Sequence, residues 1–233
     1  MLAEHTHKQF DADLEAVRAR VLEMGGLVED QVNKAVEALV TQNAQLAEEV
    51  IANDSLVNSL EITSDEACTQ IIALRQPAAS DLRMIMTIIR AITDLERIGD
   101  EAVKIAHFTV KSLNNDRIAI PRYSEIKYMA DLAIKMLRTS LDSFARVDAS
   151  SAAAVARQDM EVDEEFHLIA RHLVTYMMED PRNISLFIDL MFVVKAIERI
   201  GDHAKNISEY VVYMVKGKDV RHATLEQLER ELE

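Results

Sequence analysis

The chain has few of the residues that break helices or cross-link a fold. Only five glycines and three prolines occur in 233 residues, and tryptophan is absent. Cys68 is the single cysteine, so no intrachain disulfide can form, which favours a reducing compartment. The first residues carry no basic flank and no apolar core, so we expect no secretory signal and a cytoplasmic location.

Long apolar runs and an excess of positive charge are also missing. Charged residues such as Arg83 and Arg90 interrupt the apolar stretches before any reaches the ~18 residues of a membrane span. We therefore expect no direct membrane insertion. The 40 acidic residues outnumber the 26 basic ones, giving a formal charge of −14. Binding to nucleic acid is not expected either, because phosphate backbones attract cationic side chains.

The residues that are abundant favour helices. Ala, Leu, Ile, Met, Glu and Lys dominate, and no alternating strand-like run stands out, so the sequence predicts an all-α protein. Pro77 and Pro181 each follow a long helical stretch and indicate corners between helices. The clearest linker runs from Leu113 to Pro121. These breaks predict six long helices, at about 6–42, 45–76, 78–113, 122–147, 149–180 and 182–216.

The two halves of the chain repeat one unit. The pentapeptide Glu-Arg-Ile-Gly-Asp at 96–100 occurs again, letter for letter, at 198–202. Pro77 and Pro181 correspond at nearly the same shift. Long helices are stable only when packed lengthwise, so each half is expected to be an up-down-up three-helix bundle. The sequence thus predicts two tandem three-helix bundles that arose from an internal duplication.

The duplication also sets the expected domain boundaries. The first repeat is placed at 1–115, the second at 116–217, and a C-terminal tail at 218–233. Leucines at helical spacing between 225 and 232 allow a short amphipathic helix in this tail. A frayed terminus is the simpler expectation.

Each repeat carries two carboxylates one helical turn apart. Glu96 and Asp100 stand at i and i+4, as do Glu198 and Asp202, and each pair continues an apolar helix face. Like charges at this spacing destabilise a helix by ~0.2–0.5 kcal/mol, and by more beside a buried stripe, unless a cation or proton intervenes. A glycine inside each pair leaves room for an ion or for a close neighbouring helix.

The preceding helix of each half supplies matching acids. Asp159 and Asp163 lie at i and i+4, and the first half has Asp54 and Asn58 at the corresponding positions. If these helices pack antiparallel, the acids face the Glu-x-x-x-Asp pairs, and hard oxygen ligands of this kind suit Fe, Mn, Mg or Ca. The expected metal ligands are therefore Asp54, Glu96, Asp100, Asp159, Asp163, Glu198 and Asp202.

Two alternatives stay open. The acids form a solvated helix face with salt bridges such as Asp100–Lys104 and Asp202–Lys205. The second alternative is a carboxylate-bridged di-metal oxidoreductase, because the Glu-x-x-His motif of such helical bundles occurs at 4–7 and 164–167. These two motifs do not align in the duplication, and no glycine-rich phosphate loop or nucleophile elbow is present. We therefore expect no enzymatic activity.

The repeated motif and its flanks resemble the PhoU family of phosphate-signalling regulators. The stretches that carry the resemblance are 94–100 and 196–207, with flanking matches at 24–28, 65–72, 75–83 and 213–222. The resemblance implies two three-helix bundles with surface clusters of Fe, Mn, Zn or Mg held by the Glu-x-x-x-Asp pairs. Lys104 stands beside the first pair and Asn58 replaces an aspartate there, so the second repeat is expected to bind metal better.

The resemblance also implies a regulatory role. Members of the family link the phosphate ABC transporter to a sensor histidine kinase and hold the phosphate-starvation response off when phosphate is plentiful. We accordingly expect a negative regulator and adaptor in phosphate homeostasis. Its expected partners are the kinase, the ATPase subunit of the transporter and a second copy of the chain in a homodimer.

Overall fold

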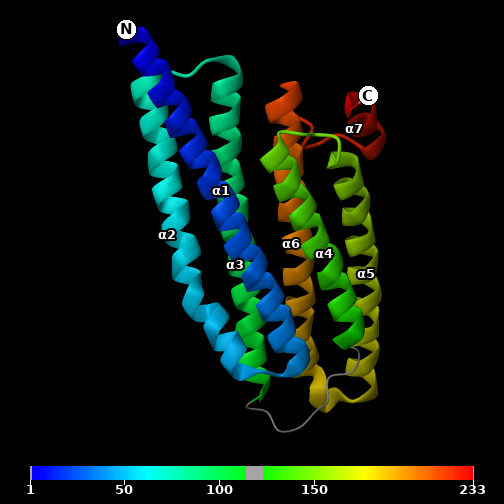
Figure 1. The fold of residues 1–233 in the computed structure, drawn as a ribbon. Helices are drawn as coiled ribbons and strands as arrows, with labels where there is room; N and C mark the ends of the chain where they lie inside the picture. Colours follow the sequence, from blue (N-terminus) through cyan, green and yellow to red (C-terminus); the bar gives the residue numbers. More distant parts are fainter. Residues whose placement is uncertain (1, 114–122, 233) are drawn as a thin grey trace.

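A computed structural model describes residues 2–113 and 123–232 of the protein (Figure 1). The predicted linker therefore lies, apart from Leu113, outside the described residues. The described residues form helices and no strand, as the all-α prediction requires. The helices are α1 (Leu2–Thr41), α2 (Ala44–Arg75), α3 (Ala79–Leu113), α4 (Tyr123–Arg146), α5 (Ala152–Glu179), the short 3₁₀ turn η1 (Pro181–Asn183), α6 (Ile184–Lys216) and α7 (Leu225–Leu232).

Local chemistry explains where the long helices begin and end. The Asn43 side chain caps α2 by accepting a hydrogen bond from the backbone N–H of Leu46 at 3.1 Å. Pro77 separates α2 from α3, and Pro181 opens η1 between α5 and α6, so both predicted corners are confirmed. Gly217, with φ of 73°, ends α6 in the left-handed conformation that favours glycine.

Each half is a three-helix bundle, and the two bundles are joined along their third helices. Helices α1–α3 pack on one another, as do α4–α6, each in up-down-up order (Figure 1). The most extensive helix pairing among the described residues is between α3 and α6, which run antiparallel. The predicted pair of bundles is confirmed, but this joint between them was not foreseen.

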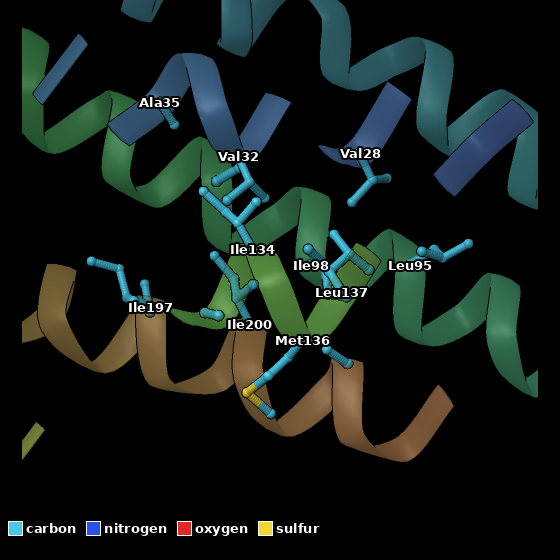
Figure 2. Close-up of a cluster of buried hydrophobic side chains, with 14 of the residues drawn as sticks. Val28, Val32, Ala35, Leu95, Ile98, Ile134, Met136, Leu137, Ile197 and Ile200 are labelled. Carbon is cyan, nitrogen blue, oxygen red and sulfur yellow. The ribbon is translucent and has the colours of Figure 1, made fainter. Parts of the chain in front are cut away.

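One continuous apolar core runs through both bundles. Figure 2 shows its centre, where side chains of α1, α3, α4 and α6 meet. The labelled residues are Val28, Val32, Ala35, Leu95, Ile98, Ile134, Met136, Leu137, Ile197 and Ile200. Burying a side chain of this size stabilises a fold by ~1.5–3 kcal/mol relative to exposure. The repeats are therefore held together by the same kind of packing that holds each of them.

The tail is ordered, so the expectation of a frayed terminus was wrong for residues 225–232. Thr224 Oγ1 accepts a hydrogen bond from the N–H of Gln227 at 3.3 Å, and Gln227 Oε1 accepts one from the N–H of Thr224 at 2.8 Å. This reciprocal capping box starts α7. Leu228 of α7 is buried in a small second core with Val212 and Val220, which fixes the tail against the second bundle.

No helix among the described residues is long and apolar enough to cross a membrane. This finding agrees with the interrupted apolar stretches in the sequence.

Two adjacent glycines of α1 allow a test of the contact between the bundles. A Cβ added at Gly25 would lie 2.6 Å from Leu141 Cδ2 of α4, whereas one added at Gly26 would meet nothing within 4 Å. Gly26→Ala should therefore raise the free energy of unfolding by about 0.5–1 kcal/mol, through helix propensity alone. Gly25→Ala should lack this gain and cost up to about 1 kcal/mol, because the Leu141 side chain must change rotamer to make room.

Urea unfolding of the two variants checks this, with Gly26→Ala as the matched control. In a Leu141→Ala background the cost of Gly25→Ala should shrink, because the clashing methyl groups are gone. Equal stabilisation by both alanines would contradict the close approach of α1 and α4.

Candidate metal centres

The predicted metal ligands face one another across a pair of helices in each bundle. In the first bundle they come from α2 and α3, and in the second from α5 and α6. Both pairs of helices run antiparallel, as expected from the up-down-up order (Figure 1). We call Asp54, Glu61, Glu96 and Asp100 the first acid cluster, and Asp159, Asp163, Glu198 and Asp202 the second acid cluster.

Burial and mutual repulsion both act on the carboxylates of the first acid cluster. Burial raises the pKa of Glu96 above its ordinary value. Carboxylates on both helices raise it further, those of Asp100, Glu61 and Asp54. The pKa of Glu61 is raised as well, again mainly by burial. Among the described residues none of these four carboxylates forms an ion pair. The cluster is therefore a concentration of negative charge without a cationic side chain bonded to it.

Glu61 was not among the predicted ligands. It lies seven residues after Asp54, so two helical turns place both on one face of α2. This spacing is the sequence feature that could have identified it.

Lysines compensate the second acid cluster. Lys195 Nζ lies 2.5 Å from both carboxylate oxygens of Glu198, and Lys205 Nζ lies 2.7 Å from Asp159 Oδ2. Glu198 and Asp159 are both buried. Among the described residues Asp202 has no such partner. Its side chain is exposed, but partial desolvation of the carboxyl group, followed by repulsion from the neighbouring carboxylates, raises its pKa to about 6.

The salt bridges expected on a solvated helix face do not form. Lys104 binds Glu101 at 2.9 Å instead of Asp100, and Lys205 binds Asp159 instead of Asp202. Lys104 is therefore not bonded to the first acid cluster, which removes one of the two reasons for favouring the second repeat. Lys195 and Lys205 bind acids of the second cluster, whereas among the described residues no lysine binds an acid of the first cluster.

Buried oxygens without donors lie beside the first acid cluster. They are Gln31 Oε1, Asp54 Oδ1 and Asn58 Oδ1. A Cβ added at Gly99 would lie 3.2 Å from Gln31 Oε1 and 3.9 Å from Asp54 Oδ1, so the missing side chain of this glycine keeps the space between them open. Leaving a buried acceptor unsatisfied costs about 1–3 kcal/mol. A cation or a water molecule would satisfy such oxygens, and this donor set fits a hard metal ion.

The second repeat has no counterpart to this oxygen set. A Cβ added at Gly201 would meet Met136 Sδ at 3.6 Å and Val162 Cγ1 at 3.5 Å. Met136 corresponds to Gln31 in the duplication, so an apolar side chain stands where the first repeat has an amide. The two glycines are equivalent in sequence but have different surroundings.

The acids of each cluster do not yet form a closed ligand shell. Among the described residues, no three His, Cys, Asp or Glu side chains are arranged so that they could hold one metal ion. Binding a cation to either cluster would therefore require carboxylate side chains to change rotamer.

The structure does not assemble the di-metal oxidoreductase alternative at residues 164–167. Glu164 and His167 are exposed on α5, and His167 Nδ1 lies 2.9 Å from the backbone carbonyl oxygen of Asp163 in the same helix. Di-iron carboxylate sites place their Glu-x-x-His ligands inside a bundle. The other motif, at 4–7, lies in the first turns of α1, where the side chains are outside the description.

A polar network between the bundles was missed by the sequence analysis. The Nδ1–H of His203 donates to Asp94 Oδ1 at 2.7 Å, and Asn206 Nδ2 donates to the same oxygen at 3.3 Å. Asp94 and His203 are buried between α3 and α6. His203 is thus directed at the other repeat, away from a metal beside Asp202, and the network fixes how the two helices align.

Comparisons with known proteins agree with the duplication. The family model for the PhoU domain matches residues 21–109 and again residues 126–211, once in each repeat. The chain is 48% identical to the phosphate-specific transport system accessory protein PhoU homolog of Pseudomonas putida, over 100% of this chain and 90% of that protein. It is 43% identical to the phosphate-specific transport system accessory protein PhoU of Escherichia coli K12, over 98% of this chain and 94% of that protein.

Two solved structures share the fold. The crystal structure of PhoU from Pseudomonas aeruginosa has a TM-score of 0.86 and 47% identity, and covers 90% of this chain and 100% of its own. The crystal structure of the phosphate transport system regulatory protein PhoU from Streptococcus pneumoniae has a TM-score of 0.83 and 28% identity. It covers 91% of this chain and 99% of its own.

The raised pKa of Asp202 makes stability depend on pH in a defined direction. Below about pH 4 the carboxyl is protonated in both the folded and unfolded states. Between about 4 and 6 the folded state binds the proton more tightly, so this carboxyl's contribution to stability falls as pH rises. Asp202→Asn should therefore stabilise the metal-free protein by about 0.5–1 kcal/mol at pH 7, because the side chain is partly screened by solvent, and by nothing at pH 3.5.

Urea unfolding in chelator at several pH values measures this difference. Asp142→Asn, an exposed aspartate of α4, is the matched control and should show little change. A stabilisation by Asp202→Asn that is the same at pH 3.5 and pH 7 would contradict the electrostatic account.

Proposed function

The chain belongs to the PhoU family, and we propose that it is a negative regulator of phosphate uptake and of the phosphate-starvation response. The observation that carries this proposal is identity of 43–48% over nearly the whole chain to proteins named as accessory proteins of the phosphate-specific transport system. Because both repeats match the family, the proposal concerns the complete described fold.

We further propose that the chain acts by binding other proteins and not by catalysis. In this role it is an adaptor between the ATPase subunit of the phosphate ABC transporter and the sensor histidine kinase that responds to phosphate. The naming of its relatives as accessory proteins supports an adaptor. Such a role belongs in the cytoplasm, and the single cysteine is consistent with that compartment.

A homodimer is part of the same proposal. Large apolar side chains are exposed on the helices, among them Leu74 at 76% and Met178 at 79%. Exposed apolar surface of this kind favours association with another protein surface.

The acid clusters are proposed to bind metal, with the first cluster the stronger site. Its four carboxylates lack cationic partners among the described residues, and the Gln31, Asp54 and Asn58 oxygens lie beside them without donors. A bound Fe, Mn, Zn or Mg ion would supply positive charge that offsets the repulsion and ties α2 to α3. The residues that would hold it are Asp54, Glu61, Glu96 and Asp100.

A reporter strain tests the regulatory role. In a bacterium whose own family member is deleted, a reporter driven by the phosphate-starvation response should be active even in abundant phosphate. Expression of this chain should return the reporter to its repressed level in abundant phosphate, and should leave it inducible when phosphate is withdrawn. If the reporter stays fully active although the chain is expressed and folded, the proposed function is wrong.

Metal analysis tests the clusters independently of function. Untagged protein should carry metal by inductively coupled plasma mass spectrometry, and Glu96→Gln/Asp100→Asn should lose more of it than the matched pair Glu198→Gln/Asp202→Asn. Chelator should lower the melting temperature of the wild type more than that of the first variant, because a ligand bound only by the folded state stabilises it. Protein without metal, and without a response to chelator, would refute both sites.

A further inference from the structure

A groove of about 440 Å³ lies where the C-terminal half of α3 passes the N-terminal half of α6. Its apolar part is formed by the buried side chains of Phe108, Val193 and Ala196. Cationic side chains stand along both walls, with Lys104 and Lys111 on α3 and Lys195 and Arg199 on α6. Each of these four is at least 45% exposed.

Because the chain is duplicated, the other end of the α3–α6 pair carries the positions that correspond to those of the groove. The N-terminal half of α3 passes the C-terminal half of α6 at the other end of the same helix pair. There the Arg90 guanidinium lies over the rings of Tyr210 and Tyr213, at 5.7 and 5.5 Å from their centres. Thr87 donates to the Tyr210 carbonyl oxygen at 3.3 Å, and Asp94 accepts from Asn206. Side chains of α3 and α6 therefore contact and hydrogen-bond one another at this end.

At the groove the same positions hold different residues. Phe192 stands at the position equivalent to Arg90, and Lys104 and Lys111 stand at those of Asn206 and Tyr213. The stacked arginine is therefore replaced by a phenylalanine that is 70% exposed. Two lysines face it where the other end has an amide and an aromatic ring.

The apolar surface continues from the groove along α6. Ile184, Ile188 and Phe192 follow one another at four-residue spacing and are 40%, 44% and 70% exposed. Residues at this spacing lie on one face of a helix. The groove thus opens onto an exposed apolar ridge.

The charge of the groove is opposite to that of the chain. Four Lys and Arg side chains line it against two acids, Glu101 and Asp189, while the whole protein carries −14. Lys111 binds Asp189 at 2.6 Å, and Glu101 is shared between Lys104 and Arg199 at 2.9 and 2.8 Å. Lys195 binds Glu198, which does not line the groove, so four cations face three acids and the groove keeps a net positive charge.

We propose that this groove docks an acidic amphipathic segment of a partner protein. An apolar side chain of that segment packs on Phe192 and Phe108, and its carboxylates pair with Lys104 and Lys111. Apolar anchors give such docking its affinity, and complementary charge gives it speed and selectivity. The proposal rests on the adaptor role proposed above and assigns that role a surface and a partner chemistry.

Photocrosslinking in cells tests the groove directly. Phe192 is replaced by p-benzoylphenylalanine in the full chain, with the same replacement at Ile62, an equally solvent-facing residue of α2, as the control position. The linked peptide is identified by mass spectrometry. The expected product, formed at 192 and not at 62, is a peptide of another protein with two or more carboxylates within about five residues of the linked site. A link to a phospholipid, to a second copy of this chain or to a non-acidic segment, or no link, overturns the proposal.

The charge requirement is tested on the linked segment, synthesised as a labelled peptide. Lys104→Glu/Lys111→Glu should weaken its binding to the full chain at least tenfold at low salt, and Phe192→Ala several-fold, with each variant still folded at the temperature of the assay. Leu56→Ala on α2 should bind as the wild type does. Binding that ignores the lysines overturns the proposal. Repression of the reporter by the wild-type chain is recorded alongside, so that a failure of the groove and a failure of the regulatory role are distinguished.

Discussion

The antiparallel packing of α3 on α6 is the constraint on which the other features depend. Each of these helices has one face in its own bundle and another against its partner, so both are buried on two sides. The acid clusters lie where these two helices face α2 and α5. The alignment is fixed by the buried hydrogen bonds of His203 and Asn206 to Asp94, because a shift by one turn would leave this carboxylate without donors.

The two repeats have diverged in how they manage negative charge. In the second, lysines bind Asp159 and Glu198, and Met136 fills the interior beside Gly201. In the first, Gln31 takes the position of that methionine, and its oxygen has no donor. Neutralising an acid with a lysine of the same chain is permanent, whereas an uncompensated cluster responds to ions in its surroundings. Duplication has therefore produced one cluster in which lysines bind two of the four acids and one in which no acid of the cluster has a lysine partner among the described residues.

Much of this fold follows from local rules that a sequence reveals. Scarce glycine and proline mark the ends of long helices, and the repeated pentapeptide shows that the halves are copies. The facing of Asp54 and Glu96 follows from the up-down-up order. The helix α7 could also have been predicted, because Thr224 and Gln227 form a capping box. The tail was instead expected to fray because it lies at the end of the chain. The ion-pair partner of Lys104 and the packing of α3 on α6 could not be predicted from the sequence. They depend on the rotation of helices that are apolar on several sides, which periodicity does not fix.

The shared core limits the ways in which this molecule can change state. Two domains joined by a hinge move as separate bodies when little apolar surface lies between them. Here Val32, Ile98, Ile134 and Ile197 meet across the joint, so swinging one bundle away from the other would expose the centre of the core to water (Figure 2). We therefore expect the two bundles to move together as one rigid body. In the adaptor role proposed above, a signal would therefore pass between partners through occupancy and charge at the surface, and not through opening and closing of the halves.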